Sequence, residues 1–157
     1  YYTKGELNNG RKVYYSNKKF YQIEFASKDT TYESIQLSFK KNDNNFKIYG
    51  IKGGIFYENK PFSDCLKKQK EIRKEITTQF DNLKVFNQKV YNHLADKTGK
   101  SKKKDVEIVF TKTSELIAIT CIDWSKKLTK EKNWIDNLGI GLYSKEYENW
   151  LRNEAYK

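Results

Sequence analysis

The segment from Ser63 to Leu83 constrains the fold more than any other, because its apolar residues repeat with the period of an α-helix. With about 100° between successive residues, six side chains fall within about 80° of one another, and most of the charged residues face the opposite way. This pattern predicts one long amphipathic helix at about 63–82 that packs on a core. Its inward face would comprise Cys65, Gln69, Ile72, Ile76, Phe80 and Leu83.

The second cysteine, Cys121, lies in an apolar stretch at 115–124 that has the length of a β-strand. Within that stretch Ile117, Ile119 and Cys121 would share one face. Because Cys65 would also point into the core, we predict that the helix lies across this strand and that Cys65 and Cys121 form a disulfide. Structural disulfides favour a periplasmic or secreted protein. Two buried free thiols are the alternative, and they would fit a cytoplasmic one.

Alternating apolar residues predict further strands on both sides of the helix. A short strand through Val13 and Tyr15 would follow a turn at Asn8 to Gly10. The segment at 46–59 contains Gly53 and Gly54, which predict a bulge or a close approach. After the helix we favour a short strand near 90–94, and one helical turn within 125–134. The remaining strands are predicted at 20–26, 33–40, 105–111, 115–124 and 138–142.

The order of these elements predicts an α+β fold, with an antiparallel sheet built from hairpins. Ser144 can cap a short C-terminal helix in which Tyr147, Trp150 and Leu151 share a face. We expect the helices on one face of the sheet, and the other face is then a candidate binding surface. A chain of 157 residues fits a single globular domain over 1–157. No apolar run approaches the roughly 20 residues of a membrane-spanning helix.

The formal net charge of +11 would ordinarily point to an anionic partner. Only three of the 31 basic residues are arginine, however, and the abundant Lys, Asn, Ile, Tyr and Phe have AT-rich codons. We therefore interpret most of the charge as a solvated surface. The densest cluster lies in a predicted exposed hairpin tip at 96–104. Its lysines are candidates for binding an anionic polymer, with a solvated loop as the alternative: Lys97, Lys100, Lys102, Lys103 and Lys104.

Catalytic motifs are sparse. His93 is the single histidine, which disfavours a zinc site, and its flanks hold no nucleophile-elbow sequence. We predict no metal and no cofactor. The tetrad at 96–99 resembles the phosphorylation motif of P-type ion pumps, but Lys100 replaces the threonine that follows there. Residues 99–101 resemble the end of a P-loop, but Leu94 stands at the first glycine position. We interpret both resemblances as chance.

Three functional hypotheses follow from these observations. The favoured one is a periplasmic or secreted, non-catalytic binding or interaction domain that a disulfide stabilises, with a protein or an anionic polymer as partner. The second is a polyanion-binding protein that uses the lysine-rich tip to contact nucleic acid, an anionic glycan or a membrane surface. The third is a small hydrolase or nuclease that uses His93.

Overall fold

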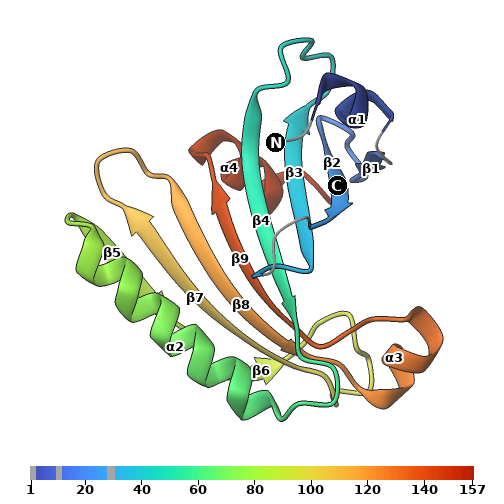
Figure 1. Ribbon diagram of the computed structural model, residues 1–157, viewed down its shortest axis with the longest axis vertical. Coiled ribbons are helices and arrows are strands. Elements are labelled where there is room, and N and C mark those ends of the chain that lie inside the picture. The colour runs from blue at the N-terminus through green and yellow to red at the C-terminus, as the bar shows by residue number, and fades with distance from the viewer. Residues whose placement is uncertain (1–2, 10–11, 28–30) are drawn as a thin grey trace.

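A computed structural model describes residues 3–9, 12–27 and 31–157. In these ranges the chain forms one nine-stranded antiparallel sheet with four helices (Figure 1). The strand order is β1-β2-β3-β4-β9-β8-β7-β5, and β6 pairs with β7. The strands are β1 (Lys12–Tyr14), β2 (Phe20–Ala26), β3 (Ser34–Lys40), β4 (Ile48–Phe56), β5 (Leu83–Asn87), β6 (Tyr91–Asn92), β7 (Lys102–Phe110), β8 (Leu116–Asp123) and β9 (Asn137–Tyr143). The helices are α1 (Lys4–Asn9), α2 (Phe62–Gln79), α3 (Lys126–Lys132) and α4 (Lys145–Asn153).

The long helix α2 confirms the main prediction from the sequence. It begins directly after Pro61, which cannot donate a backbone hydrogen bond and so is tolerated at a helix start. It ends at Phe80, whose backbone is extended. Its buried residues Cys65 and Gln69 face the strands β7, β8 and β9. The core beneath it comprises Val106, Ile108, Ile119, Cys121 and Leu138.

The C-terminal helix α4 lies on the opposite face of the sheet from α2, so the expectation that both helices share one face is wrong (Figure 1). Ser144 caps α4 as predicted, because its Oγ accepts a hydrogen bond from the Tyr147 backbone nitrogen at 3.3 Å. The buried residues Tyr147 and Trp150 pack on Phe20 of β2, with ring centroids 5.2 and 4.8 Å from that of Phe20. A second, aromatic core therefore lies under α4.

The N-terminal strands carry a third cluster, on the same face as α2. Ile23, Leu37 and Phe39 are buried there, and Leu7 of α1 packs against them. We predicted a turn at Asn8 to Gly10. The structure instead places Asn8 and Asn9 in the helix α1, and Gly10 lies outside the described residues.

Strand β4 runs without interruption through Gly53 and Gly54, so the predicted bulge is wrong at this place. The register shift lies instead between the pairs Ser38–Gly50 and Phe39–Ile48, where Tyr49 is the extra residue of β4. A Cβ on Gly53 would come within 2.5 Å of the Tyr32 ring, and one on Gly54 within 2.6 Å of the Ser34 hydroxyl. The two glycines thus make room for neighbouring side chains, whereas the sequence suggested a close approach of backbone.

The region after α2 differs from expectation in its boundaries. The strand β5 follows the helix almost at once, and β6 is only two residues long, at Tyr91 and Asn92. Residues 102–104 belong to β7, so the exposed tip is shorter than predicted. Helix α3 occupies seven residues where one helical turn was expected. None of the helices in the described ranges is both long enough and apolar enough to cross a bilayer.

Candidate functional site

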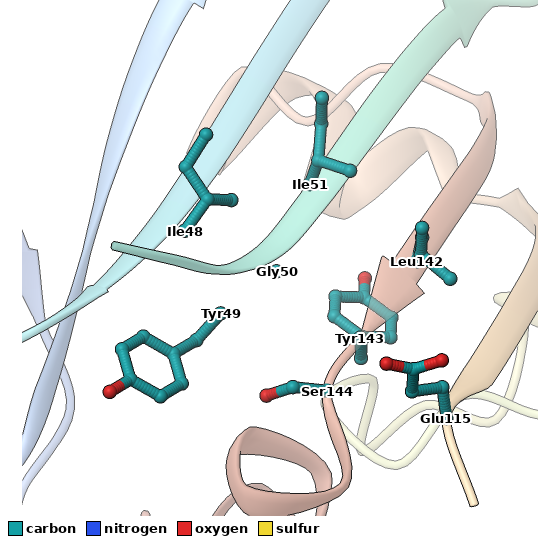
Figure 2. A pocket seen from close by; sticks show the side chains of 8 residues that line it. All are labelled: Ile48, Tyr49, Gly50, Ile51, Glu115, Leu142, Tyr143 and Ser144. Atoms are coloured by element: carbon teal, nitrogen blue, oxygen red, sulfur yellow. The ribbon is translucent and has the colours of Figure 1, made fainter. Parts of the chain in front are cut away.

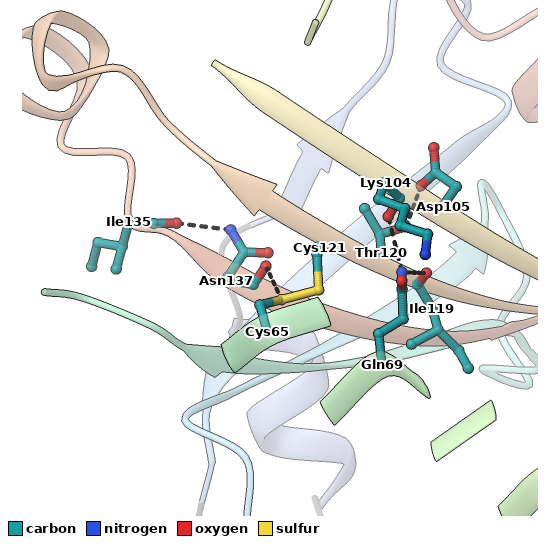
Figure 3. The surroundings of a disulfide bond; sticks show 9 residues. All are labelled: Cys65, Gln69, Lys104, Asp105, Ile119, Thr120, Cys121, Ile135 and Asn137. Atoms are coloured by element: carbon teal, nitrogen blue, oxygen red, sulfur yellow. Dashed lines mark hydrogen bonds between the residues drawn. A yellow bond between two sulfur atoms is a disulfide. The ribbon is translucent and has the colours of Figure 1, made fainter. Parts of the chain in front are cut away.

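A disulfide joins Cys65 of α2 to Cys121 of β8, as the sequence predicted (Figure 3). The two Cα atoms are 6.0 Å apart, and both residues are almost fully buried. One turn further along α2, the Gln69 amide nitrogen donates to the carbonyl oxygens of Lys104 at 3.0 Å and Ile119 at 2.7 Å. The helix is therefore fixed to two neighbouring strands by one covalent bond and two hydrogen bonds.

The five candidate lysines at 97–104 do not form one cluster. Lys97 and Lys100 are exposed in the turn that precedes β7. Lys102 donates to the Asn92 side chain at 2.7 Å. Lys103 lies 3.1 Å from a carboxylate oxygen of Asp105, on the face opposite α2. Because side chains alternate along a strand, Lys102 and Lys104 lie on the α2 face of β7 and Lys103 on the other; of the three, Lys104 lines the space beside α2.

Lys104 contributes to a basic groove that the sequence analysis missed. Here "basic groove" denotes a cavity of about 450 Å³ between α2 and β7, at which Lys67, Lys70 and Arg73 of the helix meet Lys104. Within the described ranges these four cations form no ion pair. The spacing of Lys67, Lys70 and Arg73 at every third residue was the available signal. The helical pattern predicts that Lys67 and Lys70 face away from the core, and in the structure both line this cavity.

The second sheet face, which we proposed as a binding surface, carries a row of polar residues across three strands. Glu24, Gln36 and Lys52 occupy matching register positions on β2, β3 and β4. Next in the row are Gly141 and Ala118, and the ring of Tyr143 lies over Gly141. The row ends at Glu107 of β7, which accepts a hydrogen bond from Arg152 of α4 at 2.8 Å.

Asp105 is the most buried carboxylate on this second face, with only 7% of its surface exposed. It accepts hydrogen bonds from the Tyr91 hydroxyl and, at 2.6 Å, from the Thr120 hydroxyl. Burial raises the pKa of Tyr91, and the hydrogen bond to Asp105 adds to the effect. With Lys103 as a third partner, Asp105 is occupied by structural interactions.

His93 has the contacts of a packing residue. Its ring centroid lies 4.4 Å from that of Trp124, and its Nδ1 accepts a hydrogen bond from the Ala95 backbone nitrogen at 3.1 Å. Burial lowers the pKa of His93, and nearby Lys103 lowers it further. His93 does not line the basic groove. In the described ranges no group of three or more His, Cys, Asp or Glu side chains could hold a metal ion.

The tetrad at 96–99 forms a tight turn. Asp96 accepts hydrogen bonds from the backbone nitrogen and hydroxyl of Thr98, at 2.9 and 2.7 Å, and two more from Ser101. The hydrogen bonds from Ser101 and Thr98 hold the pKa of Asp96 well below its usual range. This carboxylate therefore shapes the loop and is not presented to a substrate.

Three carboxylates, those of Glu58, Asp123 and Asp136, line a further cavity of about 380 Å³ beside α3. Burial raises the pKa of both Asp123 and Asp136. Asp136 also accepts a hydrogen bond from the Trp124 backbone nitrogen at 2.6 Å. The cavity is lined by cations as well, Lys126 and Lys130.

A shallow apolar hollow lies at the opposite end of the sheet (Figure 2). Ile48 and Ile51 of β4 and Leu142 of β9 line this cavity of about 180 Å³, together with Glu115 at the start of β8. A neighbouring cavity of about 240 Å³ shares Ile51 and Leu142 and extends to Ile76 of α2. Branched aliphatic side chains thus line a strip between α2 and the N-terminal strands.

No protein-family model matches this sequence, and no curated protein is similar to it. The fold and the buried crosslink define a disulfide-stabilised α+β domain. They assign it no activity by themselves, because one fold carries many functions.

Proposed function

We propose that this protein is a periplasmic or secreted binding domain without catalytic activity. The observation that carries the proposal is the buried Cys65–Cys121 disulfide between α2 and the sheet. Disulfides form and persist in oxidising compartments, whereas the cytosol keeps thiols reduced. The candidate His93 and Asp96 are taken up by packing and by a turn, which supports a non-catalytic role.

Thiol counting in protein taken directly from its native cells tests the compartment. Cells would be quenched with an alkylating reagent before lysis, and the mass of the chain would be measured without reduction. We expect both cysteines to be unmodified and the chain to be two hydrogen masses lighter than the reduced form. A sample reduced before alkylation is the control. Alkylation of both cysteines in the unreduced native sample would contradict the extracytoplasmic assignment.

A second candidate function, binding of a polyanion, is favoured by the basic groove. Four cations converge there without acidic partners in the described part of the chain, so their charge is available to a ligand. Arg73 adds a planar guanidinium, which grips phosphate or sulfate through two hydrogen bonds. If each of the four cations neutralised one phosphate of a single-stranded nucleic acid, a plot of log K against log salt concentration would have a slope of about −3.

Charge neutralisation in the groove tests this candidate. We would replace Lys67, Lys70 and Arg73 with glutamine and measure binding to heparin and to single-stranded RNA over a salt series. The control carries the same loss of charge at Lys41, Lys47 and Lys157, which are exposed on the β3–β4 connection and at the C-terminal end. We expect the groove variant to lose most of its affinity and salt dependence. Equal losses in both variants would show that only net charge attracts the polymer.

A further inference from the structure

Lys52 of β4 lies on the sheet face opposite α2. Its ammonium nitrogen takes part in no hydrogen bond or ion pair in the described ranges. Its aliphatic stem crosses Gly139 of β9, where a Cβ would come within 2.6 Å of the Lys52 Cε. Glycine at this position therefore allows the lysine to lie along the sheet rather than project into solvent.

Lys52 also lines a small polar cavity of about 110 Å³. Strands β2, β3, β4 and β9 all contribute to it, so regular secondary structure fixes its floor. The Gln36 amide donates to the Glu24 carboxylate at 3.3 Å, which orients both groups. The full lining is Glu24, Ser34, Gln36, Lys52, Gly54, Phe56 and Asn137.

One negative and one positive side chain line this cavity, on strands that are separated by β3. Glu24 and Lys52 stand on either side of Gln36 in matching register, so their backbones are separated by two strand spacings, about 9.5 Å. A free inorganic anion would be attracted by Lys52 but repelled by Glu24. A ligand that carries both a carboxylate and an ammonium group would pair with both residues at once. Phe56 supplies an apolar wall for a short side chain.

Burial and the nearby Lys103 both lower the pKa of Lys52, whereas Glu24 and Asp105 oppose this effect. An unpaired cation that is kept from water is costly, and a bound carboxylate would remove the cost by completing an ion pair. The cavity thus supplies the cation of an ion pair, and a ligand carboxylate would supply the anion.

We propose that the cavity around Lys52 binds a small free amino acid, with the ligand carboxylate on Lys52 and the ligand ammonium group on Glu24. This inference deepens the proposed binding function by naming a ligand class. It does not depend on the cellular compartment or on the basic groove, which lies on the other face of the sheet.

Titration calorimetry and amide NMR with glycine, alanine, serine and β-alanine test the proposal, with acetate and methylamine as single-charge comparisons. We expect at least one amino acid to bind and to shift the amide signals of residues 24, 36 and 52, and both comparison compounds to bind at least tenfold more weakly. Lys52→Gln and Glu24→Gln should each weaken binding tenfold or more. Lys60→Gln, at an exposed position outside the cavity, is the control and should leave the affinity unchanged.

Gly139→Ala gives a second variant that retains every charge. Its methyl group would displace the Lys52 stem, so binding should weaken while the thermal unfolding temperature remains high enough for the measurement. Absence of binding by every amino acid in the panel would overturn the proposal. So would binding that persists in both Lys52→Gln and Glu24→Gln, or acetate binding as tight as that of the amino acids. A failed heparin experiment would leave this result unaffected.

Discussion

Asp96 accepts two hydrogen bonds from Ser101, one from the backbone nitrogen at 2.9 Å and one from the hydroxyl at 2.7 Å. The same hydroxyl accepts a hydrogen bond from the Ser125 backbone nitrogen at 2.9 Å. The carboxylate thus connects the turn before β7 to the segment that leads into α3. Because these bonds favour the ionised form, they link the geometry of this region to pH.

Acid should therefore weaken this region through Asp96. Its pKa is lowered in the folded chain, so its stabilising contribution is present above the ordinary value of 3.8 and is lost as the pH falls below it. We expect Asp96→Asn to lower the unfolding temperature at neutral pH, and the difference from the wild type to shrink below about pH 4. Thermal unfolding followed by circular dichroism at several pH values measures this. A difference that stays constant down to pH 2 would contradict it.

Removal of the disulfide should be the most destabilising change considered. The bond closes a loop with a sequence separation of 56 residues, for which the loop-entropy relation gives about 4 kcal/mol. We expect the Cys65→Ala, Cys121→Ala double variant to lose about that much free energy of unfolding in denaturant titrations. Reduced wild-type protein provides the comparison without a change of sequence. If both samples lost less than about 1 kcal/mol of free energy of unfolding, the disulfide would contribute little to stability and the prediction would be wrong.

Gln69 should contribute more to the free energy of unfolding than a polar residue on the outer side of the same helix. Replacing it with leucine removes both hydrogen bonds from its amide nitrogen to the strand carbonyls. We expect a loss of about 1–3 kcal/mol, because a buried polar group without its partner bears the full cost of desolvation. Gln79→Leu, at an exposed position near the end of α2, is the matched control and should change little. Equal effects of the two substitutions in urea titrations would contradict this assignment.

Lys52 should reduce stability in the absence of a ligand. Its pKa is lowered in the folded chain, so at neutral pH the unfolded chain holds the proton more readily than the folded one. Lys52→Met should therefore stabilise the protein at pH 7 by about 1 kcal/mol. This advantage should shrink as the pH rises toward the ordinary value of 10.5, where the unfolded lysine also loses its proton. Denaturant titrations at pH 7 and pH 10 measure the free energy of unfolding of both proteins. A larger stabilisation by Lys52→Met at pH 10 than at pH 7 would contradict this prediction.

Local patterns predicted α2 and its inward residues from Cys65 to Ile76 well, because a helical repeat over several turns leaves few alternatives. Phe80 and Leu83, which were predicted on the same face, lie beyond the end of the helix. The disulfide followed from the same pattern, since Cys65 and Cys121 each occupied the apolar side of an element. The sheet face on which α4 packs could not be predicted from such local patterns. It depends on the pairing of β4 with β9, which brings Ser144 and the helix after it next to Phe20, more than 120 residues away in the chain.

The candidate sites depend even more on distant contacts. In the sequence Lys104 was one of five equivalent candidates for binding an anion. It differs from the other four because it lines a cavity together with cations of α2. Lys52 gave no local signal, because its features arise from Gly139 and from the strands that carry Glu24 and Gln36. Sequence patterns thus identified most of the helices and strands, whereas the layering and the cavities arise where strands that are distant in sequence become neighbours.

The position of the disulfide in the chain has a mechanical consequence. The covalent ring from Cys65 to Cys121 encloses most of α2, all of β5, β6 and β7, and most of β8. A force applied to the two chain ends could straighten only the segments outside that ring. The fully stretched molecule would therefore be shorter by about 190 Å than the same chain after reduction. Tension alone would leave those strands tethered in a closed loop.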